Sequence, residues 1–282
     1  MLLHIIEMVE YQDPYCTWCW GFEPILRKIK ELYGDQVKII FKAGGLVEDL
    51  DEQIAQQWFE QVAQHWLDAS ERHGMPVDVQ VWQDLQGEFR STYPANIAYK
   101  AAQMQDPELA NTFLRRMREA AAAERRYIHK RAVQLELARE VGLDSEKFVN
   151  ALEDSSAEKA FYEDLEEFRA SGSKAYPTFL ITNRQGKRVL LSGYRRFELF
   201  KGIFKDLAGD ELVKKTPEVT SENILAFIRK YNKVTTREVA EVFDLADLQA
   251  EDMLKILESE DSVVKITAGN GYFWLEKKEI LF

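Results

Sequence analysis

The only two cysteines of this 282-residue chain lie three positions apart, within the stretch Asp-Pro-Tyr-Cys-Thr-Trp-Cys-Trp. Before Cys16, residues 2–11 are mostly apolar, which is typical of a buried strand. After Cys19, apolar residues recur at helical spacing over 22–32, and a second strand pattern follows at 37–41. A strand, a turn with Cys16, a helix and a strand predict a βαβ unit with parallel strands.

The spacing of the two cysteines predicts redox chemistry. Side chains three residues apart at the start of a helix share one face, so the sulfurs of Cys16 and Cys19 can form a disulfide with little backbone strain. Unpaired N–H groups and the helix dipole favour the thiolate form of Cys16, which is the nucleophilic form. We therefore expect Cys16 to exchange with a partner's sulfur and Cys19 to resolve the mixed disulfide.

A metal site is the alternative use of such a pair. A structural zinc ion needs four ligands, commonly from a second cysteine pair or from two suitably spaced histidines. The chain has no further cysteine, and its four histidines, at positions 4, 65, 73 and 129, are scattered. We expect no metal and no other cofactor, although the cysteines by themselves leave the zinc alternative open.

Helical patterns dominate residues 46–170. Amphipathic segments run through roughly 95–120, 126–141 and 156–170. We expect this block to be a helical insertion that packs on the sheet.

Strand patterns return at 178–182 and 188–191, and the polar, Gly-containing stretch between them predicts a hairpin. The two halves of one sheet would therefore flank the insertion. We expect residues 1–45 and 171–212 to form this α/β core.

Residues 213–282 carry a third pattern. Three short helices, one with a capping box from Thr235 to Glu238, precede a hairpin around Gly269 and Gly271. This order predicts a small winged-helix-like domain. Over 216–282 there are 8 Lys and Arg against 13 Asp and Glu, so the net charge is 8 − 13 = −5. Because groove-reading surfaces are basic, we expect protein–protein contact, including dimerisation, and not DNA binding.

The charge of the whole chain points the same way. Its formal net charge of −11 disfavours nucleic acid and anionic membranes as partners. No apolar run approaches the roughly 20 residues of a membrane span, and the N-terminus lacks the basic region of a signal peptide. We therefore expect a cytoplasmic protein, in which a cysteine pair is catalytic or redox-sensing and not a structural disulfide.

Residues near the cysteine pair have alternative roles. Asp13 could transfer a proton to or from the thiols, or it could cap the turn. Pro24 could kink the helix, or it could be a proline of the first turn. We expect Gly44 and Gly45, after the second strand, to form a loop with positive φ.

Several aromatic residues could line a hydrophobic groove near Cys16, or could belong to the core. We expect most to be core residues and Trp18, between the cysteines, to be partly exposed. The group consists of Trp18, Trp20, Phe22, Trp58, Phe59, Trp66 and Trp82.

Together these features resemble the DsbA-like branch of the thioredoxin superfamily. The resemblance rests on the motif from Asp13 to Trp20, on Pro24, on the strand-opening Tyr176-Pro177-Thr178-Phe179 and on the helical insertion, and it covers roughly residues 1–210. It implies an α/β thioredoxin fold with a large helical insertion, beside the winged-helix-like domain. It also implies that Cys16 is the nucleophile, Cys19 the resolving thiol and Pro177 a cis proline lying against the pair.

The resemblance assigns roles to the neighbouring residues. Thr17 and Trp18 occupy the dipeptide that tunes the redox potential, and with Tyr176 and Pro177 they would contact substrate. Strongly oxidising members carry histidine where this chain has Trp18, so a milder potential is implied.

The resemblance implies more than one function. FrnE-type cytosolic members are oxidoreductases, which predicts a thiol:disulfide oxidoreductase or isomerase acting on protein or small-thiol disulfides with a thiol electron donor or acceptor. Other members are adaptors that present proteins to a protease, so a non-enzymatic redox-sensing or protease-adaptor protein is the alternative. Related isomerases of small aromatic compounds lack the cysteine pair.

Overall fold

A four-stranded mixed sheet forms the centre of the molecule in the computed structural model, which describes residues 4–277. Its strand order is β2-β1-β3-β4, where β1 and β2 are parallel and the other pairs antiparallel. The strands are β1 (Ile6–Gln12), β2 (Val37–Ala43), β3 (Thr178–Asn183) and β4 (Arg188–Ser192). The predicted βαβ unit and hairpin are confirmed. The start of the strand predicted from residue 2 falls on residues outside the described range.

Helix α1 (Thr17–Tyr33) connects β1 to β2, and a 3-10 turn, η1 (Gly34–Gln36), follows it. The helix begins five residues earlier than its apolar pattern predicts. Apart from the partly exposed Trp18, its first turns are buried on every side, so they show no apolar stripe. Pro24 therefore lies in the helix interior, and the alternative of a first-turn proline is wrong.

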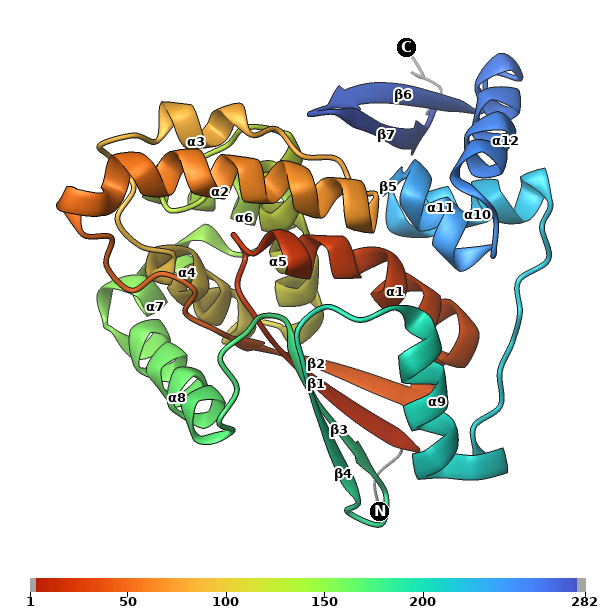
Figure 1. Cartoon of the computed structure of the whole chain (residues 1–282), viewed down its shortest axis with the longest axis horizontal. Coiled ribbons are helices and arrows are strands. Elements are labelled where there is room, and N and C mark those ends of the chain that lie inside the picture. The colour runs from red at the N-terminus through yellow and green to blue at the C-terminus, as the bar shows by residue number, and fades with distance from the viewer. Residues whose placement is uncertain (1–3, 278–282) are drawn as a thin grey trace.

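The predicted insertion is helical. The segment predicted over 95–120 is two helices, because the Asp106 carboxylate caps a new helix that begins at Pro107. The helices are α2 (Glu52–His73), α3 (Gln80–Asp84), α4 (Tyr93–Gln103), α5 (Pro107–Ala123), α6 (Arg131–Glu140), α7 (Ser145–Glu153) and α8 (Ser156–Ala170). In Figure 1 they gather on one side of the sheet, and α4 and α8 pack against β2.

A further helix, α9 (Phe197–Ala208), packs on β1 and β3 and ends in the 3-10 turn η2 (Gly209–Glu211). An extended segment then runs along the right edge of Figure 1 to the C-terminal elements at the upper right. The boundaries predicted near 45, 170 and 212 stay predictions.

The C-terminal region holds a helix, a strand, two helices and a hairpin. Its elements are α10 (Ser221–Tyr231), β5 (Lys233–Thr235), α11 (Thr236–Val242), α12 (Asp247–Ser259), β6 (Val263–Ala268) and β7 (Gly271–Glu276). The predicted capping box and hairpin are confirmed, and the sequence analysis missed the short strand β5, which pairs with β7. A separate buried cluster, including Phe227, Leu254 and Trp274, gives this region its own core.

The C-terminal region packs closely on the rest of the molecule. Helix α11 lies against α1, and the turn of the β6–β7 hairpin contacts the segment after α2. Asn270 N donates to Val77 O at 3.0 Å, and Val77 N donates to the Asn270 side chain at 2.8 Å. A Cβ on Gly269 would lie 2.3 Å from the Val77 backbone, so only glycine permits this approach.

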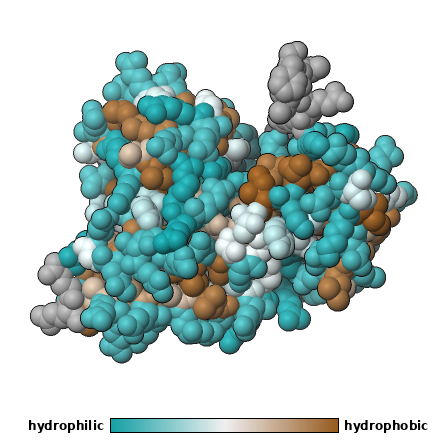
Figure 2. Space-filling model, turned by 90° about the horizontal axis from the view of Figure 1, so that it is seen from above, coloured by the Kyte–Doolittle hydropathy of each residue, from teal (hydrophilic) through white to brown (hydrophobic). Residues whose placement is uncertain are grey.

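Hydrophilic residues predominate on the face shown in Figure 2, and the hydrophobic residues there form separate small patches. Within residues 4–277, no helix combines the length and the apolar composition that crossing a bilayer requires.

Candidate thiol site

Cys16 is the N-cap residue of α1 and has an extended backbone (φ −77°, ψ 113°). Its N–H donates to Asp13 O at 3.0 Å, and its carbonyl accepts from Trp20 N at 3.0 Å. Cys16 and Cys19 are both free thiols. The motif therefore forms a tight turn that places the first sulfur at the amino end of the helix, as the sequence predicts.

The structure brings Cys16 together with Tyr176, the residue before the predicted proline, although 160 positions separate them. The Tyr176–Pro177 peptide is cis, and Cys16 Sγ donates to Tyr176 O at 3.6 Å. The carbonyl of Pro177 accepts from Gly193 N at 2.8 Å, which ties this loop to the end of β4. Cys16 and Cys19 thus lie in one buried cluster with Tyr176, the residue before Pro177.

Cys16 is only 4% exposed, and Cys19 is fully buried. Cys16 nevertheless lines a cavity of about 350 Å³. We call this the thiol cavity; its walls include Tyr15, Trp18, Trp58, Trp66, Trp82 and Tyr176. Such a wall suits an apolar substrate group beside the reacting sulfur.

Most of the seven aromatic residues considered from the sequence are core residues, as expected. Trp20, Phe22, Phe59, Trp66 and Trp82 belong to the buried core. Trp18, Trp58, Trp66 and Trp82 line the thiol cavity, and Trp18 is partly exposed as predicted. Apolar spacing could not separate these groups, because each helix buries both kinds of position.

Asp13 is fully buried, and four donors surround its carboxylate: Tyr15 N, Leu46 N, Thr92 Oγ1 and Asn96 Nδ2, at 2.6–2.9 Å. Burial raises the pKa of Asp13, and these hydrogen bonds oppose that change. The contacts fit the alternative in which Asp13 caps the turn. Proton transfer by Asp13 stays a prediction.

The prediction of positive φ at Gly44 and Gly45 is wrong, since neither residue lies in the left-handed region. The glycines are needed for close packing instead. A Cβ on Gly44 would lie 2.4 Å from the Tyr176 ring, and one on Gly45 would lie 2.7 Å from the Tyr93 ring. Gly45 N also donates to the Tyr176 hydroxyl at 2.9 Å, so this loop positions the residue before the cis proline.

The dipeptide between the cysteines contacts two histidines of α2. Met75 N donates to His73 Nδ1 at 3.0 Å, so the proton of the neutral ring is on Nε2, which lies 3.3 Å from Thr17 Oγ1. Burial, with a smaller effect of Arg237, lowers the pKa of His73 to about 3. Trp18 Nε1 donates to His65 Nε2 at 3.1 Å. The insertion therefore holds both residues of the dipeptide.

Sequence reasoning missed two charged residues beneath the thiols. Glu10 on β1 and Arg118 on α5 are both fully buried, and Arg118 Nη2 donates to Glu10 Oε1 at 2.9 Å. Burial raises the pKa of Glu10 to about 7. Burial also raises the pKa of the Cys19 thiol, and Cys16 and Glu10 raise it further, whereas Arg118 lowers it. An acid inside an otherwise apolar strand was the available signal for Glu10; no local signal marks Arg118.

These charges continue away from the thiols as an alternating series. Arg118 Nη1 donates to Glu23 Oε1 at 2.6 Å, and Arg115 Nη1 donates to Glu23 Oε2 at 3.2 Å. Arg115 also donates to both carboxylate oxygens of Glu238, at 2.7 and 3.0 Å. The series runs from Glu10 to α11 in the C-terminal region. Within residues 4–277, no group of three or more His, Cys, Asp or Glu side chains is placed to hold a metal ion.

Two family models match separate parts of the chain. A model described as Thioredoxin matches residues 10–202, and one described as FaeA-like protein matches residues 220–275. The ClpXP adapter protein SpxH of Halalkalibacterium halodurans is 30% identical, over 95% of this chain and 88% of that protein. SpxH of Bacillus subtilis is 29% identical over the same shares.

Solved structures resemble the thioredoxin part. The cytosolic disulfide reductase DsbM from Pseudomonas aeruginosa gives a TM-score of 0.55 at 23% identity, over 73% of this chain and 96% of that chain. A 2-hydroxychromene-2-carboxylate isomerase gives 0.54 at 12% identity, over 73% and 97%. At these identities the likeness shows the fold. With its cysteine pair, its sheet and these matches, the chain belongs to the thioredoxin superfamily as a DsbA-like protein.

Proposed function

We propose that this chain exchanges thiols and disulfides through Cys16 and Cys19. The observation that carries the proposal is the position of Cys16. Cys16 is the N-cap residue of α1, its sulfur donates to the carbonyl of Tyr176 before Pro177, and the residue lines the thiol cavity. A sulfur held in this position suits exchange with a substrate sulfur that enters the cavity.

Exchange would proceed in two steps. The Cys16 thiolate attacks one sulfur of a substrate disulfide, which forms a mixed disulfide and releases the other sulfur as a thiolate. Cys19 then loses its proton to Glu10 and attacks Cys16 Sγ, which releases the second substrate thiolate. The cysteine pair becomes a disulfide, the substrate gains the two electrons, and an external thiol reductant must restore the pair.

Reduction of insulin disulfides by a dithiol donor tests this function. We expect the wild type to accelerate reduction, Cys16→Ser to lose the acceleration, and Cys19→Ala to accumulate a mixed disulfide that mass spectrometry detects. Equal rates for wild type and Cys16→Ser would exclude exchange at this site.

A specific observation favours a second role, as an adapter for the ClpXP protease. Relatives named for that role match 95% of this chain, including the C-terminal region, whereas the disulfide reductase matches 73%. The adapter relatives therefore resemble nearly the whole chain, whereas the disulfide reductase resembles the thioredoxin part. A cytoplasmic location, protein partners and dimerisation belong with these proposals.

A pull-down with ClpX, followed by a ClpXP degradation assay on the captured proteins, tests the adapter role. We expect this chain to accelerate the degradation of the captured proteins. The Cys16→Ser variant then shows whether delivery to the protease requires the thiol. Full acceleration by Cys16→Ser would make the thiols dispensable for delivery. No acceleration by the wild type would exclude the adapter role and leave exchange to be judged on the insulin assay.

A further inference from the structure

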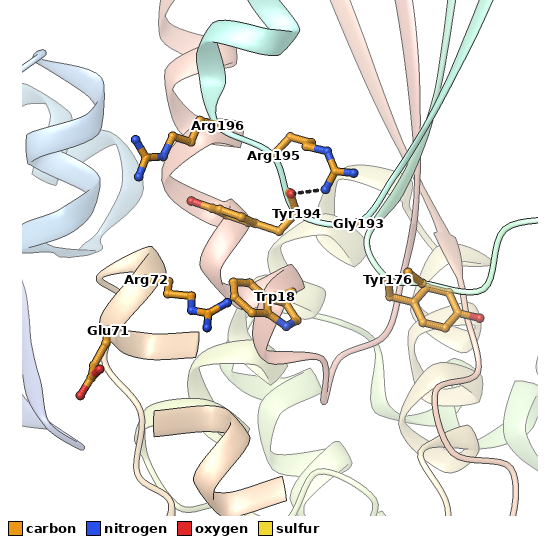
Figure 3. Close-up of a pocket in the computed structure, with 9 residues that line it drawn as sticks. Trp18, Glu71, Arg72, Tyr176, Gly193, Tyr194, Arg195 and Arg196 are labelled. Carbon is orange, nitrogen blue, oxygen red and sulfur yellow. Dashed lines mark hydrogen bonds between the residues drawn. The ribbon is translucent and has the colours of Figure 1, made fainter. Parts of the chain in front are cut away.

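A second hollow adjoins the thiol cavity and is rich in arginine (Figure 3). Its volume is about 700 Å³, and Trp18 and Tyr176 line both hollows. The loop after β4 and the end of α2 supply Arg72, Arg195 and Arg196. A group bound beside these arginines would therefore be continuous with a group at Cys16. We call this second hollow the arginine pocket.

The three arginines have no acidic partner among the described residues. Arg195 donates to the adjacent Tyr194 carbonyl at 2.8 Å, and none of the three forms an ion pair with a carboxylate of residues 4–277. By contrast, Arg237 on α11 pairs with two acids, Glu241 and Asp247. The chain has 48 acidic residues against 37 Lys and Arg, so acidic partners are in surplus. Three arginines without an ion pair are therefore a specific local feature, although Arg72 and Arg196 also line a neighbouring hollow that holds Glu198, Glu241 and Asp244.

The geometry around the arginine pocket keeps the positive charge available. Figure 3 shows Arg72 extending toward Trp18, whereas the carboxylate of Glu71, the only acid in the lining, points away from the arginines. The rings of Trp18 and Tyr194 lie 5.4 Å apart and give the pocket an apolar wall. Guanidinium groups bind carboxylates through parallel hydrogen bonds, and an aromatic wall suits the adjoining aliphatic stem.

We propose that the arginine pocket binds a carboxylate of the disulfide substrate, one or two residues from the exchanging sulfur. The proposal rests on exchange at Cys16 and names the class of substrate: acidic thiol peptides, in which Asp, Glu or a terminal carboxylate flanks the cysteine. The apolar thiol cavity receives the group on the other side of the sulfur. Selection by charge is then separate from the chemistry of the two cysteines.

Two matched peptides test the proposal. Disulfide-linked dimers of Glu-Cys-Glu and Gln-Cys-Gln, with blocked ends, have nearly the same size and differ in charge. Each rate is divided by the rate with dithiothreitol alone, which removes intrinsic differences in reactivity. We expect the wild type to prefer the acidic peptide about tenfold at low ionic strength, and added salt to reduce this preference.

Variants then locate the effect. Arg195→Gln and Arg72→Gln should each reduce the preference about two- to fivefold, as expected for exposed ion pairs. Arg188→Gln, at the opposite end of β4, is the matched control and should keep the wild-type preference. No preference in the wild type, or an unchanged preference in both pocket variants, would overturn the proposal.

A binding measurement separates this proposal from the proposed function. S-methylated Glu-Cys-Glu and Gln-Cys-Gln cannot exchange, so calorimetry with them reports binding alone. If neither disulfide peptide is exchanged, the proposed function fails. Tighter binding of the acidic peptide that Arg195→Gln weakens would still support the arginine pocket, whereas equal binding of both peptides would refute it.

Discussion

Glu10 and Glu238 occupy the two ends of the buried charge series, and both are fully buried glutamates. Glu10 accepts from Arg118 through one oxygen, and its other oxygen has no partner. Glu238 accepts from both nitrogens of Arg115, from Arg27 and from Thr235 N. Burial raises the pKa of Glu10. Burial acts in the same direction at Glu238, but the positive charges of Arg115 and Arg27 have the larger effect, so the pKa of Glu238 is lowered. The number of donors, and not burial, decides which glutamate can exchange a proton.

The largest expected effect is the loss of stability when Glu238, the glutamate with more hydrogen-bond partners, is replaced. Glu238→Gln leaves Arg27 and Arg115 buried with one partner fewer and removes a hydrogen-bond acceptor of the capping box. Breaking a buried ion pair from one side costs about 3–5 kcal/mol. Urea unfolding should show this loss of stability, with the exposed Glu260→Gln as control. If the free energy of unfolding falls by less than about 1 kcal/mol, the ion pairs of Glu238 contribute little to holding the C-terminal region against the rest of the molecule.

Replacing Glu10, at the other end of the series, should affect the exchange reaction more than the stability of the fold. Glu10→Gln keeps the size and an acceptor for Arg118 but cannot take the proton of Cys19. We expect the resolving step to slow about 100-fold, which is typical of losing a general base, and the pH dependence near 7 to disappear. Stopped-flow measurement of mixed-disulfide resolution tests this, with Glu7→Gln on the same strand as control. A wild-type rate and pH profile in Glu10→Gln would assign the proton to another group.

The same comparison predicts opposite pH effects on stability. The folded pKa of Glu10 is raised from 4.5 to about 7, so its contribution is present below pH 4.5 and is lost as pH rises through 7, by roughly 3 kcal/mol. The pKa of Glu238 is lowered, so its contribution is present above pH 4.5 and is lost as pH falls.

Urea midpoints between pH 3 and 8 test this prediction. In the plot of urea midpoint against pH, Glu10→Gln should reduce the change that the wild type shows near neutral pH. Glu238→Gln should reduce the change at acid pH. Identical profiles for both variants would remove the distinction between the two ends.

The smallest expected effect concerns α1, which lies between the two ends and carries the thiols and Glu23. Gly21→Ala places a Cβ about 2.3 Å from the buried His73 ring, so it should destabilise the protein by about 1–3 kcal/mol. Gly202→Ala in α9 meets no atom within 4 Å and should stabilise by about 0.5–1 kcal/mol, as glycine removal from a helix does. Thermal unfolding of the pair measures the difference. Stabilisation by both substitutions would show that α1 can shift without consequence.

The sequence by itself determined the elements and the chemistry that local patterns encode. The strand, turn, helix and strand around Cys16 and Cys19 follow from apolar spacing, because neighbouring residues decide which face a short element buries. The capping box at Thr235 and the hairpin at Gly269 are equally local, since their hydrogen bonds join residues a few positions apart. Pro177 could be tied to Cys16 only through a family resemblance, since no local pattern reports a contact across 160 residues.

Tertiary structure alone decided which polar residues serve the site. Glu10 and Arg118 lie 108 positions apart, and the pKa of Glu10 depends on how completely other elements exclude water from it. The arginine pocket likewise joins the end of α2 to the loop after β4, and its arginines form no ion pair with a carboxylate of the described residues. Burial and pairing are properties of the assembled chain, so apolar spacing could predict helices and strands but not the protonation state of a residue within them.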